Sequence, residues 1–270
     1  MKLFALSVGL LLVAAPFAVR ADDLDDALQA LKDAEPSKDV AKIKQLAAAA
    51  HQTAQKWETA TPPSDADKEN YEARARYAKD VDTYSEYSLY ALAIQSDSKV
   101  GADLVATLEA QNPKSKYLDM PDLLMIEVDG AVGRKQTDRA VTLANRMIAA
   151  ANKKAPDGIS AADWERTKSS ALGRGYFVVG SIACERNQYK VADTNLRSAL
   201  PLIKGNNAMM GPALFCLGVV NYNLANMTAS KAKMLEAAKF SEQAAAIPGP
   251  TQDQAYKNSI AMKAQADKMR

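Results

Sequence analysis

The chain has 270 residues, of which 34 are Lys or Arg, 32 are Asp or Glu and one is His, and 48% are hydrophobic. With only 12 Gly and 11 Pro, this composition excludes a disordered chain and a turn-rich all-β fold. The near-balance of charge leaves no surplus of cations to neutralise phosphates, so nucleic acid is not an expected partner.

The first 21 residues have the order of a secretory signal peptide. Lys2 precedes an apolar stretch over residues 3–15, and Val19-Arg20-Ala21 supplies the small side chains of a cleavage site. The apolar stretch is shorter than the roughly 20 residues of a membrane-spanning helix. We therefore expect cleavage after Ala21 and a mature chain that has no integral membrane span and is periplasmic or secreted. An uncleaved membrane anchor is the alternative.

The remaining sequence predicts a succession of helices separated by short polar or proline-bearing segments. Residues 22–63 predict a hairpin of two helices, and one long helix is expected from about residue 67 to residue 95. Ser160 is placed to cap the helix that follows it. Gly173-Arg174-Gly175 is interpreted as easing a helix start, because no strand precedes it as a dinucleotide-binding loop requires. No strand–turn–strand signal is present, so the fold class is all-α.

Residues 173–206 carry the clearest repeat signal. Gly180 in the first expected helix lies twelve positions before Ala192 in the second, and small side chains at both would allow the helices to approach closely. The segment as a whole places its apolar residues in the pattern of one repeat unit: Tyr176, Val179, Gly180, Ala183, Tyr189, Ala192, Leu196 and Ala199. In this pattern the chain resembles the tetratricopeptide repeat (TPR) family, whose unit is a helix–turn–helix of 34 residues.

Three further segments resemble the same unit less closely. Residues 211–250 offer Gly218 in the first helix and Ala237 or Ala238 in the second, and we expect the extra residues near 226–232 to lengthen the turn between them. In residues 121–154 and 83–116 the pairs twelve positions apart are Val128 with Ala140 and Tyr90 with Ala102, followed by Ala144 and Ala106.

The resemblance implies a right-handed α-solenoid of antiparallel helix hairpins over residues 64–250. Each repeat of a solenoid buries its faces only against its neighbours, so the two ends must face water. Residues 22–63 and 251–270 are expected to provide these ends, the second as a polar capping helix.

The sequence contains few candidate catalytic residues. His51 is the one histidine of the chain, and a general base needs an orienting partner and a nucleophile within reach, so we expect no catalytic residue. One His and two Cys without clustered spacing predict no metal site and no cofactor. Asp82 and Glu86 share an expected helix with Arg74 and Lys79, and this mixture of charges is interpreted as a solvated face.

The resemblance further implies a non-catalytic scaffold that binds a protein or peptide of the cell envelope. The family's groove-facing positions correspond here to Tyr84, Tyr87, Met125, Arg174, Phe177, Phe215 and Tyr222. Large apolar side chains dominate this set, which favours a hydrophobic segment or an amphipathic helix over a free acidic C-terminus as the partner. Packing between neighbouring helices is the alternative role for these side chains. A receptor for a small ligand, or an envelope enzyme that uses carboxylates or Ser, are the alternative functions.

Cys184 and Cys216 are the two cysteines of the chain. In the repeat frame they are offset by six residues along parallel helices, which is about 9 Å at 1.5 Å per residue. A disulfide tolerates a Cα separation of up to about 7 Å. We therefore expect two buried free thiols, with a disulfide as the alternative if the repeats slide.

The expected signal peptide gives a testable prediction about the N-terminus of the mature protein. N-terminal sequencing of exported protein should give a chain that begins at Asp22, because the apolar stretch is short and ends at a small-residue site. A chain that still carries Met1 would contradict the prediction.

Overall fold

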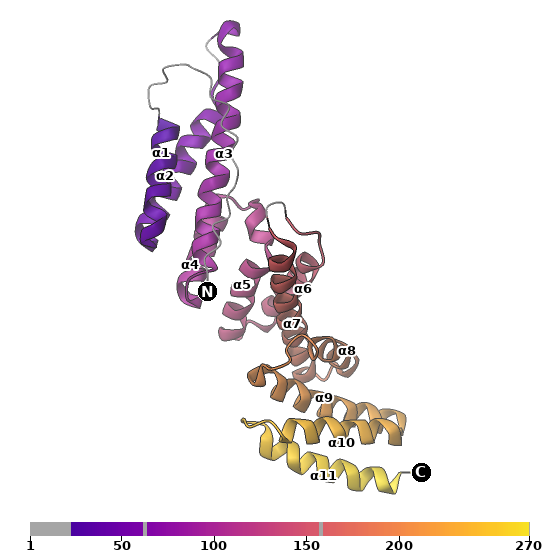
Figure 1. The fold of residues 1–270 in the computed structure, drawn as a ribbon. Helices are drawn as coiled ribbons and strands as arrows, with labels where there is room; N and C mark the ends of the chain where they lie inside the picture. Colours follow the sequence, from indigo (N-terminus) through magenta and orange to yellow (C-terminus); the bar gives the residue numbers. More distant parts are fainter. Residues whose placement is uncertain (1–22, 62–63, 157–158, 270) are drawn as a thin grey trace. The chain divides into compact units, whose positions relative to one another are not determined.

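The computed structural model describes residues 23–61, 64–156 and 159–269 (Figure 1). Within these ranges the chain forms eleven α-helices and three short 3-10 helices, and no strand, so the all-α prediction is confirmed. The expected leader, residues 1–21, lies outside the described residues. The chain divides into two compact units, which meet within one helix at residues 130 and 131.

The first unit is built on four helices: α1 (Asp23–Ala34), α2 (Val40–Glu58), α3 (Lys68–Ala93) and α4 (Ser98–Gln111). Each packs against the next along the chain, and α3 also contacts α1. Two aspartates start their helices, since Asp39 accepts a hydrogen bond from the Lys42 N–H and Asp97 from those of Lys99 and Val100. Helix α5 (Pro121–Gly133) begins in this unit.

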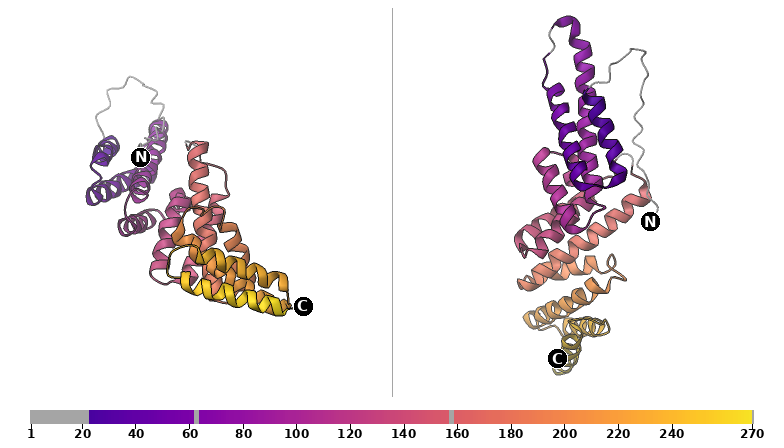
Figure 2. Two further views of the ribbon diagram at one scale, coloured as in Figure 1. Left: turned by 60° about the horizontal axis from the view of Figure 1, so that its bottom comes forward. Right: turned by 90° about the vertical axis from the view of Figure 1, so that its left-hand side faces the viewer.

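The second unit contains α6 (Thr137–Ala151), α7 (Ala161–Glu185), α8 (Tyr189–Ala199), α9 (Asn207–Thr228), α10 (Lys231–Ala245) and α11 (Gln252–Lys268). Consecutive helices pack against one another, and α9 also contacts α7 and α11. Figures 1 and 2 show α10 and α11 running side by side at the C-terminal end of this unit. The Ser160 cap is present as predicted, because the Ser160 side chain accepts a hydrogen bond from the Asp163 N–H.

Glycines on α7 allow three neighbouring segments to approach it. A Cβ atom on Gly180 would lie 2.7 Å from Leu196 Cγ of α8, and one on Gly175 would lie 2.6 Å from Ile148 Cγ1 of α6. Gly173 contacts Leu202, after α8, in the same way. The interpretation of residues 173–175 as a helix start is therefore wrong: the helix begins at Ala161, and these glycines are packing positions within it.

The turn between α9 and α10 is short, which corrects the expectation of a lengthened turn. The extra residues extend α9 to Thr228, and Ala229 then ends the helix in the left-handed conformation with a φ of 50°. Helix α9 is long and apolar enough to cross a membrane by composition alone, yet half of its apolar stretch is buried within the protein. It serves as the central helix of the second unit, in contact with α7, α8, α10 and α11.

The expected repeat frame fails in the α3–α4 hairpin. Ala106 is exposed and Ala102 is only half-buried, so neither provides the close packing assigned to it. Gly101 does so instead, because a Cβ atom there would lie 3.1 Å from the Ala93 carbonyl oxygen and 3.3 Å from Ile126 Cδ1. Sequence spacing alone placed the contact one residue too late.

Adding a methyl group to Gly180 tests the close approach of α7 and α8. The Gly180→Ala variant should lose about 1–3 kcal/mol of unfolding free energy, because the new Cβ overlaps Leu196. The matched control is Gly133→Ala, where no atom lies within 4 Å of the added Cβ. Chemical denaturation of both variants gives their unfolding free energies. Equal values would contradict the prediction, because they would mean that α7 and α8 can accommodate the added methyl group.

Candidate functional site

A cavity of about 380 Å³ lies in the second unit, between α7 and the turn that leads into α6. Its lining combines apolar side chains with two cations, one carboxylate and two hydroxyls. The lining residues are Val132, Lys135, Thr137, Ala140, Arg174, Phe177, Val178, Ser181, Ile182 and Glu185. Arg174 and Phe177 are two of the residues that the sequence predicted as partner-binding.

Local hydrogen bonds fix the turn that forms one wall of the cavity. Lys135 has a φ of 57°, and the backbone N–H groups of Lys135 and Gln136 donate to the carbonyl oxygens of Val132 and Ala131, both at 2.9 Å. This is the bonding that ends a helix at a left-handed residue. The turn therefore holds the Lys135 side chain at the cavity while α6 starts two residues later.

A polar clamp joins the start of α6 to the end of α7. Arg186 Nη2 donates to Thr137 Oγ1 and to Asp138 Oδ1, both at 2.7 Å. Because the pair is solvent-exposed, its contribution to stability is below about 1 kcal/mol, and its importance is geometric. It joins the α6 wall to the same end of α7 that carries Ser181 and Glu185.

The charged and aromatic groups of the cavity are close together on α7. The Arg174 guanidinium lies over the Phe177 ring at 5.9 Å from its centroid, a cation–π arrangement that orients both side chains. Phe177 is half-buried, whereas Val178 and Ile182 are buried and form the apolar part of the wall. A ligand here would meet an aromatic face, aliphatic side chains and a cation within one helical turn.

Ser181 supplies an unused polar group. Its Oγ atom is buried and has no hydrogen-bond partner among the described residues, although buried hydroxyls normally find one. Leaving such a group unpaired costs about 1–3 kcal/mol. A ligand atom that exchanged a hydrogen bond with Ser181 Oγ would remove this cost, so the cavity is better suited to an amphipathic group than to a purely apolar one.

The other predicted site residues lie elsewhere within their units. Phe215 and Tyr222 are half-buried on α9, and each packs beside a different core cluster, away from the cavity lining. Tyr84, Tyr87 and Met125 belong to the first unit, the first two on α3 and the third on α5. The structure thus brings Arg174 and Phe177 together and separates them from Phe215 and Tyr222.

Tyr84 and Tyr87 are members of an aromatic cluster in the first unit. Tyr87 lies 6.1 Å from Tyr84, 6.3 Å from Tyr90 and 6.0 Å from Tyr117, measured between ring centroids, and Tyr90 stacks on Tyr117 at 5.1 Å. Tyr84 Oη donates to Glu35 Oε2 at 3.0 Å, and Tyr90 Oη to Asp122 Oδ2 at 2.8 Å. Such contacts are typical of packing aromatics with satisfied hydroxyls.

A buried polar network on α3 was missed by the sequence analysis. Asp82 and Glu86 are only 7% and 6% exposed, so their interpretation as a solvated face is wrong. Asp82 Oδ1 lies 2.7 Å from His51 Nδ1, and Asp82 Oδ2 accepts from Gln55. The burial of these carboxylates is possible because α2 and the turn that follows α4 supply polar partners. The sequence of one helix does not reveal these partners.

Glu86 and Ser85 complete this network. Glu86 accepts from Asn112 Nδ2 and Ser115 Oγ, both at 2.6 Å. The Ser85 hydroxyl donates to the Asp82 backbone carbonyl and side chain, so it is bonded to the carboxylate rather than to His51. His51 has an orienting carboxylate, but the serine beside it is not arranged as a nucleophile.

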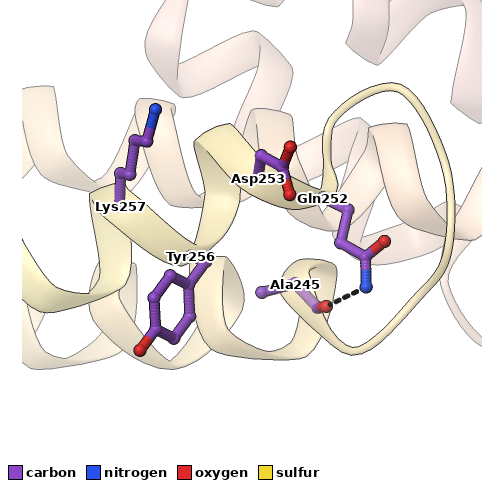
Figure 3. Close-up of a pocket in the computed structure, with 5 residues that line it drawn as sticks. All are labelled: Ala245, Gln252, Asp253, Tyr256 and Lys257. Atoms are coloured by element: carbon purple, nitrogen blue, oxygen red, sulfur yellow. Dashed lines mark hydrogen bonds between the residues drawn. The ribbon is translucent and has the colours of Figure 1, made fainter.

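A second depression, of about 260 Å³, lies at the turn from α10 to α11. Gln252 Nε2 donates to the Ala245 carbonyl oxygen at 3.1 Å, and Tyr256 and Lys257 point to opposite sides of α11 (Figure 3). Its polar side chains do not converge on one point. The cavity beside Phe177 and Ser181 is therefore the better candidate for a functional site.

Tyrosine burial leads to a prediction about alkaline pH. Burial, with a nearby carboxylate, raises the pKa of Tyr77 and that of Tyr117 to about 12, and the pKa of Tyr90 is also raised. A folded pKa above the unfolded value of about 10 means that this stability is present below pH 10 and is lost as pH rises through the folded pKa. The stability of the first unit, which holds these tyrosines, should therefore fall as pH rises from about 10 to 12.

Tyrosinate absorbance and helical circular dichroism, recorded in one titration, check this prediction. They should change together, and Tyr77→Phe should weaken the dependence of stability on pH. Tyrosinate that forms fully near pH 10 without loss of helix would contradict it.

Comparisons of this chain with protein-family models, with curated proteins and with solved structures each found no match.

Proposed function

We propose that this protein is a non-catalytic, TPR-like scaffold that binds a protein or peptide of the cell envelope. The observation that carries the proposal is the cavity on α7, which contains Arg174 and Phe177 among its lining residues. Both occupy groove positions in the TPR frame of residues 173–206, the segment in which the resemblance is strongest.

The packing of the second unit supports the repeat interpretation. Gly180 is tightly packed against Leu196 of α8, and Gly218 is tightly packed against Ser241 of α10. Helices α7 and α9, the first helices of these two hairpins, also contact each other. Stacked hairpins with close internal packing are the building principle of α-solenoids, so we propose a right-handed solenoid, with partner recognition on the first helices.

The lining of the cavity supports a proposal about the chemistry of the partner. Phe177, Val178 and Ile182 would contact an apolar side chain, while Lys135 and Arg174 outnumber Glu185 among the charged lining residues. We infer a hydrophobic segment or amphipathic helix that carries a carboxylate beside its apolar anchor. We propose that the encounter takes place in the periplasm or outside the cell, because the first 21 residues have the order of a signal peptide.

A receptor for a small ligand is the second candidate function. The volume of about 380 Å³ falls within the roughly 300–1,000 Å³ typical of ligand pockets. The unpaired Ser181 hydroxyl also fits a site in which few polar groups orient a mostly apolar ligand. A thermal-shift screen with small amphipathic carboxylates distinguishes the two, because a scaffold for proteins should show no saturable shift.

Photo-crosslinking identifies the partner and locates the site. A crosslinking amino acid in place of Val132, which is 40% exposed on the cavity wall, should capture a reproducible envelope protein in intact cells. The matched control is Tyr256, which is 61% exposed on α11 and should not capture it. Capture of the same protein from both positions would argue against the cavity as the site.

Truncating Phe177 tests the site quantitatively. Phe177→Ala should weaken binding of the captured partner at least tenfold, about 1.4 kcal/mol, because a partly buried aromatic anchor is lost. Its unfolding free energy should fall by less than the roughly 3–5 kcal/mol that a fully buried Phe costs. Binding is measured by titration calorimetry, and stability by chemical denaturation.

Phe215→Ala is the matched control for this measurement. Phe215 is a half-buried aromatic of the same unit that does not line the cavity. The control should lose stability while partner affinity stays within about twofold of the unmodified protein. Weaker binding by Phe215→Ala alone would move the site to α9.

A further inference from the structure

The two cysteines of the chain lie against each other in the second unit. Cys184 is in the last turn of α7, Cys216 is in the middle of α9, and these helices pack together. The Cys184 thiol donates a hydrogen bond to the Cys216 carbonyl oxygen at 3.9 Å. Both side chains are half-buried, so each is partly exposed to solvent.

This proximity corrects the geometric argument drawn from the sequence. An offset of six residues along parallel, in-phase helices would separate the two side chains by about 9 Å. The Cys184 thiol lies 3.9 Å from the Cys216 backbone oxygen, which is closer than this offset predicts. Sequence spacing therefore underestimated how closely Cys184 and Cys216 approach.

We propose that Cys184 and Cys216 form a modification site, at which exchange with a small organic disulfide converts the two thiols into an intramolecular disulfide. The inference rests on the approach of the Cys184 thiol to the Cys216 backbone and on the packing of α7 against α9, and it is independent of the partner proposed for the cavity. It would operate wherever the chain meets an oxidising environment, such as the periplasm or the exterior of the cell.

The reaction takes place in two balanced steps. The Cys184 thiol loses its proton to solvent, and the thiolate attacks one sulfur of the organic disulfide, which breaks that S–S bond and releases one organic thiolate. The Cys216 thiol then loses its proton and attacks Cys184 Sγ, which breaks the mixed disulfide and releases the second organic thiolate. Two protein thiols are oxidised, and one organic disulfide is reduced to two thiols.

The environment assigns the attacking role to Cys184. The neighbouring Cys216 side chain lowers the pKa of Cys184, whereas the neighbouring Cys184 side chain and burial raise the pKa of Cys216. The carboxylate near both is Glu185, which opposes thiolate formation at each. The thiolate is the nucleophile of exchange, so Cys184 reacts first and Cys216 resolves the mixed disulfide.

The bond would link α7 directly to α9 and enclose α8 in the covalent loop between them. Closing such a loop restricts the unfolded chain and raises thermal stability, by an amount on the order of 5–10 °C for a domain of this size. Helix α7 also carries Phe177 and Ser181, so the crosslink would fix the wall of the candidate site relative to α9.

Peptide mass spectrometry tests the proposal on the full chain. Reduced protein is treated with oxidised glutathione, quenched with acid, alkylated and digested with trypsin. Cleavage after Arg186 and Lys204 separates the two cysteines into different peptides. The expected product is one linked pair of peptides whose mass is two hydrogens below the sum of the two peptides and which carries no glutathione. The melting temperature of the oxidised protein should also be higher.

Two variants separate the steps. Cys216→Ser should stop after the first step and retain glutathione on Cys184, whereas Cys184→Ser should react at least about tenfold more slowly than Cys216→Ser. Circular dichroism checks that each variant is folded. If a variant does not fold, the result for the unmodified chain decides. Stable glutathione on both cysteines, a disulfide between two chains, or unchanged free thiols would each overturn the proposal.

Discussion

The second unit depends on how closely α7 approaches its neighbours. Gly175 faces Ile148 of α6, and Gly180 faces Leu196 of α8. At both positions the backbone of α7 contacts the neighbouring side chain directly, because glycine has no Cβ. These contacts set the position of α7, and α7 carries Arg174, Phe177 and Ser181 into one cavity wall. The shape of the candidate site thus depends on how tightly the helix that lines it packs against α6 and α8.

The sequence predicted what periodicity and small residues encode. The all-α class, the Ser160 cap and the buried pair Gly180 and Ala192 were all visible in it, because each depends on contacts within one helix or one hairpin. The α3–α4 register was predicted wrongly, since Gly101 and not Ala102 makes the close contact. A shift of one residue on a helix turns the side chain by about 100°. A sequence pattern can still be matched after such a shift, but the side chain then points away from its packing partner.

The cavity was predictable only in part. Arg174 and Phe177 follow from the repeat frame, but Lys135, Ser181 and Glu185 join them through the turn at residue 135 and the arrangement of α6 beside α7. The polar network of the first unit was hidden for a similar reason. Asp82 looks like any surface carboxylate in its own helix, and only the approach of α2 shows that His51 and Gln55 are its partners.

That network constrains how the first unit can diverge. Most of its core consists of Leu, Ala and Val side chains, and each tolerates exchange for an apolar side chain of similar volume at moderate cost. Asp82, at 7% exposure, cannot change in this way, because its removal leaves His51 and Gln55 without this acceptor, and a change at 51 removes one of the polar partners of a buried carboxylate. Related sequences should therefore exchange the leucines for apolar residues of similar volume and change positions 51, 55 and 82 as a set.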